Sequence, residues 1–145
     1  TNPQHYIKIL TIMSFFKNIF NNSNTEGENN DKGGLTWKIL QTEEELTALT
    51  AASSEKPVVI FKHSTSCSIS AMAKNRMERS WQVPTEKADV YYLDLIAHRN
   101  ISNKIAEDFG VIHASPQVLV IKNGEAVYDN SHYGIDATAI SKVIG

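Results

Sequence analysis

The stretch 57-PVVIFKHSTSCSIS-70 joins a continuous apolar run to the only cysteine of the chain, Cys67. Residues 57–61 are apolar without alternation, which is typical of a central strand covered on both faces. Residues 71–80 combine alanine and methionine with charged side chains, a pattern that predicts a helix ending near Trp81. Cys67 is therefore predicted to lie at a strand-to-helix junction.

On the N-terminal side of this stretch, residues 35–40 (LTWKIL) predict a first strand. Thr42 and Glu45 then have the spacing of a capping box, which predicts the start of a helix that continues through Leu46 and Leu49. These residues predict a strand followed by a helix before the central strand.

On the C-terminal side, residues 88–95 predict a strand, and residues 101–109 predict a helix that Gly110 ends. Residues 115–130 then predict a hairpin around Asn123-Gly124, a strong two-residue turn signal.

The last predicted element is a C-terminal helix with Asp136 as its N-cap. Ile135 and Ile140 have the spacing of a hydrophobic staple around that cap. The complete order is β-α-β-α-β-α-β-β-α, which predicts an α/β fold with a central mixed β-sheet flanked by helices.

Composition and charge restrict the class of protein. The chain has 145 residues, of which 41% are hydrophobic, enough for one packed domain. Its net charge is -2, from 14 basic and 16 acidic residues without a basic block, so we expect no nucleic-acid partner.

A single cysteine excludes an intrachain disulfide and fits a reducing, cytoplasmic location. We expect no membrane span, because no apolar run is long enough.

Residues 1–34 differ in composition from the rest of the chain. Residues 15–20 place apolar side chains at roughly helical spacing, which predicts a short amphipathic turn. Residues 21–34 are rich in asparagine, glycine and acidic residues, which predicts a flexible linker. We therefore predict an N-terminal extension over 1–34 and one folded domain over 35–145.

A cysteine after a central strand, and a Ser115-Pro116 dipeptide just before a hairpin, together resemble the thioredoxin fold. More narrowly, VVIFKHSTSCSISAMA (58–73) and IHASPQVLVIKNGEAVYDNSHYGI (112–135) resemble the YtxJ-type monothiol bacilliredoxins. The resemblance covers about residues 35–145. One position departs from it: the family motif has proline directly after the cysteine, where this chain has Ser68.

The resemblance implies cytoplasmic thiol-disulfide exchange that removes bacillithiol, a low-molecular-weight thiol, from mixed disulfides on proteins. Cys67 would be the nucleophile, bacillithiol the co-substrate, and bacillithiolated proteins and the small thiol the partners, with no bound cofactor. The resemblance also implies a cis-proline at Pro116 that faces the cysteine. The backbone of Ser115 would then pair with an extended thiol substrate by strand addition.

The residues around the cysteine suit this chemistry. The thiolate is the attacking species, and the N-H groups and dipole at a helix start stabilise negative charge. We expect the Ser70 hydroxyl to donate to the sulfur from the position where a dithiol enzyme has its second cysteine. Because serine cannot resolve a disulfide, Cys67 and Ser70 predict a monothiol cycle that an external thiol completes.

Further polar residues are candidates for the substrate-binding site. Thr65, Ser66 and Ser68 suit a hydrogen-bonding loop better than a core. Of the histidines that could approach the cysteine (His63, His113 and His132), His113 is the best candidate because it precedes ASPQ. Basic residues near the cysteine (Lys62, Lys74 and Arg76) fit a solvated surface, so we assign them no part in substrate binding.

Other site types lack their motifs. No close ligand spacing supports a zinc site of Cys67 and histidines, so we predict no metal. The chain has no nucleophile elbow, phosphate loop or dinucleotide fingerprint. Two functional alternatives stay open: a non-catalytic binding module on the same fold, and a redox sensor whose Cys67 is modified by oxidant. A buried, inert cysteine is the structural alternative.

Overall fold

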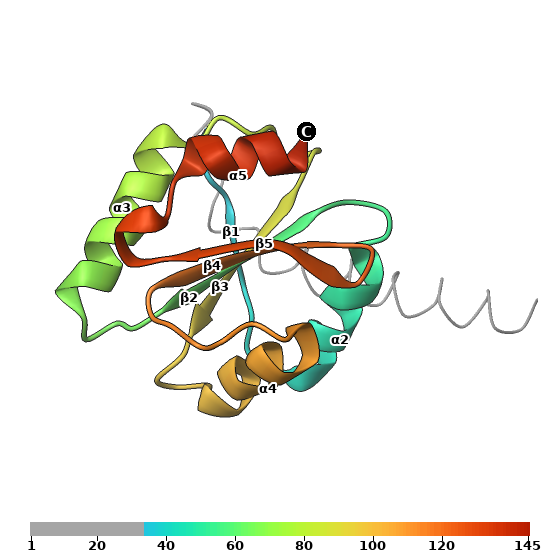
Figure 1. Cartoon of the computed structure of the whole chain (residues 1–145), viewed down its shortest axis with the longest axis horizontal. Coiled ribbons are helices and arrows are strands. Elements are labelled where there is room, and N and C mark those ends of the chain that lie inside the picture. Colours follow the sequence, from blue (N-terminus) through green and yellow to red (C-terminus); the bar gives the residue numbers. More distant parts are fainter. Residues whose placement is uncertain (1–33) are drawn as a thin grey trace, which may run out of the picture. The chain divides into compact units, whose positions relative to one another are not determined.

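Five strands form one mixed sheet in the spatial order β1-β3-β2-β4-β5, with β2 at its centre (Figure 1). β1 and β2 both run parallel to β3, whereas β4 runs antiparallel to both β2 and β5. The strands are β1 (Trp37–Ile39), β2 (Val58–His63), β3 (Asp89–Asp94), β4 (Gln117–Lys122) and β5 (Glu125–Ser131). The predicted mixed sheet is confirmed.

The helices follow in the predicted order. They are α2 (Glu43–Ala52), α3 (Ser68–Ser80), α4 (Arg99–Phe109) and α5 (Ala137–Ile144), and a short 3₁₀ helix, η2 (His132–Gly134), lies between β5 and α5. Only η2 adds to the predicted order, because three residues carry too little periodicity to signal a helix.

The structure is a computed structural model that describes residues 34–145. The predicted amphipathic turn and most of the predicted linker lie outside these residues. Contacts group the described residues into one unit. No helix among the described residues is long and apolar enough to cross a membrane.

Local signals begin and end these elements where the sequence predicts. The Thr42 hydroxyl accepts from the backbone N-H of Glu45 at 3.1 Å, and Asp136 Oδ1 accepts from the N-H of Thr138 at 3.1 Å. At the end of α4, Gly110 has a left-handed φ of 63°. Asn123 and Gly124 also have positive φ, 51° and 76°, as a two-residue hairpin turn requires.

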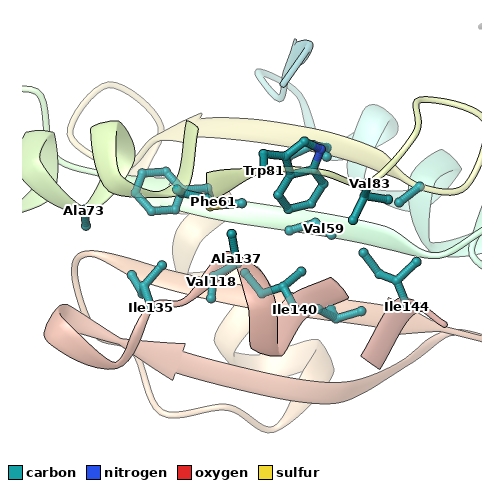
Figure 2. Close-up of a cluster of buried hydrophobic side chains, with 14 residues drawn as sticks. Val59, Phe61, Ala73, Trp81, Val83, Val118, Ile135, Ala137, Ile140 and Ile144 are labelled. Carbon is teal, nitrogen blue, oxygen red and sulfur yellow. The ribbon is translucent and has the colours of Figure 1, made fainter. Parts of the chain in front are cut away.

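Two layers of helices enclose the sheet: α3 and α5 lie on one face, and α2 and α4 on the other (Figure 1). Figure 2 shows the core under α3 and α5, where Phe61 and Val59 of β2 meet Val118 of β4 and Ile140 of α5. Ile135 belongs to the same buried cluster, as the predicted staple with Ile140 requires.

Strand β2 extends two residues beyond the end of its apolar run. All six of its residues are buried, including Lys62 and His63. Both continue the pairing with β3, opposite Leu93 and Asp94. The sequence prediction stopped at Phe61 because it followed hydrophobicity, whereas the strand follows backbone pairing.

Candidate active site

Three loops converge at one end of the central strands, where β2 and β3 end and β4 begins. β2 leads into the cysteine loop (64–67), β3 leads towards α4, and residues 111–116 lead into β4. Gln117 pairs with Lys62, so Pro116 comes next to the end of β2 and to the cysteine loop. Figure 1 shows the start of α3 and the start of β4 on this side of the sheet. In open α/β sheets, ligand sites form at such carboxyl ends of strands.

Cys67 is the N-cap residue of α3, with extended backbone angles (φ -108°, ψ 120°). Its N-H donates to the carbonyl of Ser64 at 3.1 Å, which closes a tight turn before the helix. The side chain is half-buried and makes no capping hydrogen bond. Cys67 thus stands at the start of α3, where the first backbone N-H groups have no partner within the helix.

The Ser70 hydroxyl has other partners than the predicted sulfur. Ser70 is fully buried, and its Oγ lies 2.7 Å from Nδ1 of His63 and accepts from the N-H of Ser64 at 3.1 Å. This bridge ties the start of α3 to the end of β2. Ser70 therefore holds the shape of the loop that carries Cys67.

His63 is buried on the α3 face of the sheet. Its ring stacks on Phe61, with 5.9 Å between ring centroids. Burial lowers the pKa of His63, and the positive charge of Lys74 lowers it further, although Asp94 acts in the opposite direction. A neutral imidazole is the form that this environment favours.

The other predicted hydroxyl residues of the cysteine loop face solvent. Thr65, Ser66 and Ser68 are all exposed, and Ser66 Oγ lies 3.4 Å from the hydroxyl of Ser64. They surround Cys67 in sequence and leave their side chains open to a substrate.

The Ser115-Pro116 peptide bond is cis, as the resemblance implied. The carbonyl of Pro116 accepts from the N-H of His132 at 3.0 Å. By contrast, the backbone N-H and carbonyl of Ser115 have no hydrogen-bond partner within residues 34–145. The Ser115 hydroxyl is buried and likewise without a partner in this range. An extended substrate segment could pair with this backbone.

His113 lies on the α4 face of the sheet edge. Its Nδ1 lies 3.4 Å from Nζ of Lys62 and 3.2 Å from the hydroxyl of Ser102. Lys62 is fully buried, and its Nζ also donates to the carbonyl of Ser102 at 3.1 Å. Burial lowers the pKa of Lys62 to about 8. Burial also lowers the pKa of His113, as do the charges of Lys62 and Arg99.

The assignment of Lys62 to a solvated surface was wrong, because the side chain is enclosed between the sheet and α4. Strand alternation gives the signal that could have found it: Lys62 shares a face with Ile60, which packs inward. Ser102, on the buried face of α4, also escaped the sequence analysis.

Two other basic residues have partners within the chain. Lys74 pairs with Glu78, and Arg76 donates to the carbonyls of His132 and Ile135. Arg76 thus connects α3 to η2. The third candidate histidine, His132, lies in η2 and makes no side-chain hydrogen bond within residues 34–145. No group of three or more potential metal ligands occurs in the described part of the chain.

Residues 38–140 match the protein family described as monothiol bacilliredoxin BrxC. The chain belongs to this family. The match includes the cysteine loop, α3 and the cis-proline loop, so the predicted family is confirmed. The match extends from β1 into α5.

Solved structures confirm the fold. A protein described as a candidate oxidoreductase with a thioredoxin fold is 28% identical, with a TM-score of 0.64 over 75% of this chain and 94% of that one. Thioredoxin of Malassezia sympodialis (Mala s 13) is 19% identical, with a TM-score of 0.61 over 81% and 95% of the two chains. Thioredoxin of Schistosoma mansoni is 21% identical, with a TM-score of 0.57 over 75% and 93%. This bacilliredoxin-family chain has a thioredoxin-like fold and a role in thiol redox chemistry.

Proposed function

We propose that the chain is a monothiol oxidoreductase that removes bacillithiol from protein mixed disulfides through Cys67. The single observation that carries this proposal is a half-exposed thiol at the N-cap of α3, in a chain without a second cysteine. The family match supports the same chemistry.

The proposed cycle has two exchange steps. The Cys67 thiolate attacks the bacillithiol sulfur of the mixed disulfide, an S-S bond forms to Cys67, and the client cysteine leaves as a thiolate that takes up a proton. A second low-molecular-weight thiol then attacks the Cys67 adduct. It releases Cys67 and forms a small-molecule disulfide, so each step conserves one disulfide bond.

Other residues support these steps. The unpaired backbone of Ser115 pairs with the extended client segment, and the exposed hydroxyls of Thr65, Ser66 and Ser68 bind polar parts of the substrate. Ser70 supports catalysis by holding the cysteine loop. A reducing cytoplasm, which keeps small thiols available, is the proposed location.

The test is transfer of bacillithiol from a bacillithiolated client protein, followed by mass spectrometry of both proteins. We expect an adduct on Cys67 that free bacillithiol removes, and a client restored to its thiol form. Cys67→Ser should lose both results, whereas Ser80→Ala, a control at the exposed last residue of α3, should retain the Cys67 adduct. Equal release by Cys67→Ser would refute the proposal, and no release by the wild type would favour the binding module or the redox sensor.

A further inference from the structure

The environment of His113 determines which ring nitrogen carries its proton. The ammonium of Lys62 can only donate hydrogen bonds, and it lies 3.4 Å from Nδ1. Nδ1 is therefore the acceptor, and the proton of the neutral ring is on Nε2. The Ser102 hydroxyl, 3.2 Å from the same nitrogen, can donate to it in this tautomer.

The other ring nitrogen, Nε2, is then a hydrogen-bond donor. His113 is exposed, and Nε2 lies on the side of the ring opposite to Nδ1. Nε2 has no hydrogen-bond partner among residues 34–145. The contacts of Lys62 and Ser102 with Nδ1 thus orient the ring and its Nε2-H group.

Two positively charged side chains, Lys62 and Arg99, act on His113, and neither has a carboxylate partner within residues 34–145. Arg99 lies three residues before Ser102, so both residues are on the same face of α4. Arg99 is exposed and its charge acts on His113. Within residues 34–145, neither Arg99 nor Lys62 takes part in an ion pair. The buried Lys62 ammonium has no counter-ion from the described chain.

We propose that His113 and Arg99, supported by the buried Lys62, form a subsite for a carboxylate of the low-molecular-weight thiol that exchanges at Cys67. The guanidinium and Nε2-H are donors suited to carboxylate oxygens. His113 is two residues from Ser115, in the loop that enters β4 next to the end of β2. In the proposed subsite it would take the carboxylate of a small thiol whose sulfur is at Cys67. This subsite rests on the proposed exchange at Cys67 and gives it a preference for anionic thiols.

The test uses three small disulfides of similar size and different charge. They are 3,3′-dithiodipropionate, which is anionic, 2-hydroxyethyl disulfide, which is neutral, and cystamine, which is cationic. The rate of adduct formation on Cys67 is measured by mass spectrometry for each probe. Each rate is divided by the rate of a neutral small thiol with the same probe, which removes differences in intrinsic reactivity.

We expect the normalised rate for the anionic probe to exceed that for the neutral probe, with the cationic probe slowest. Arg99→Gln and His113→Leu should each lower the anionic-to-neutral ratio about three- to fivefold, the effect of one exposed charge contact. Lys87→Gln is the control, because it removes the same charge as Arg99→Gln. Lys87 is exposed and precedes β3, at the end of this strand opposite to the site. It should leave the ratio unchanged.

Three results would overturn the subsite. One is a wild-type ratio near one, and the second is an unchanged ratio in both Arg99→Gln and His113→Leu. The third is an equal loss in Lys87→Gln, which would assign the preference to net charge alone. Failure of Cys67 to react with any of the three probes would instead refute the proposed exchange, and the subsite with it.

Discussion

Lys62 is a charged side chain in the central strand, and its burial makes its charge costly. Its ordinary pKa of 10.5 falls to about 8 because the ammonium is desolvated. Between these two pH values the unfolded chain binds more protons than the folded chain. The free energy of unfolding therefore rises with pH in this window, where the folded protein holds a neutral amine.

Replacing Lys62 with methionine should remove this pH dependence. Between pH 7.5 and 9.5, the free energy of unfolding of the wild type should rise relative to Lys62→Met by about 2 kcal/mol. Urea unfolding of both proteins at the two pH values gives this difference. Lys104→Met, at a half-exposed position of α4, is the control and should follow the wild type. A difference that does not change with pH would contradict the buried, desolvated ammonium.

Ser70 gives a second prediction for a single residue. Ser70→Ala leaves the N-H of Ser64 and Nδ1 of His63 without their partner, so the free energy of unfolding should fall by about 1 to 3 kcal/mol. Ser68→Ala, an exposed residue in the same turn of α3, should change it by less than about 0.5 kcal/mol. Equal effects of the two substitutions in urea unfolding would refute the bridging role of Ser70.

Among the elements, the β4-β5 hairpin depends most directly on its turn residues. Gly124 has a φ of 76°, in the left-handed region, and a side chain there would meet no neighbouring atom within 4 Å. The backbone angle alone therefore opposes substitution. Gly124→Ala should lower the free energy of unfolding by about 1 kcal/mol.

The measurement for the hairpin is again urea unfolding. Glu125→Ala, at the first residue of β5, changes an exposed side chain without a positive φ and serves as the control. We expect it to change the free energy of unfolding by less than about 0.5 kcal/mol. A neutral Gly124→Ala would mean that the turn adopts another conformation in solution.

For the whole molecule, the division of the chain near residue 34 is open to a direct test. All strands and helices described here lie within Trp37–Ile144. We predict that a chain starting at Gly34 folds with the same midpoint of thermal unfolding as the full chain, because its core is complete. It should also retain the rate of Cys67 adduct formation. A lower midpoint or a slower rate would assign residues 1–33 a part in the folded unit or its site.

Much of the fold was accessible from local patterns. The Thr42 and Asp136 caps, Gly110 at the end of α4 and the Asn123-Gly124 turn each depend on a few neighbouring residues, which a sequence displays directly. Continuous hydrophobicity likewise predicted that β2 is central. The element η2 and the last two residues of β2 lacked such a signal.

The sequence by itself determined the order of elements, the family resemblance and the position of Cys67 at a helix start, because short-range periodicity and capping chemistry encode these features. Only the tertiary structure decided what the polar residues contact. The side chains of Ser70 and His63, seven residues apart in the sequence, form a hydrogen bond. Lys62 contacts His113, which is 51 residues away in the sequence. Such contacts depend on how strands pair and helices cover the sheet, so no local pattern contains them.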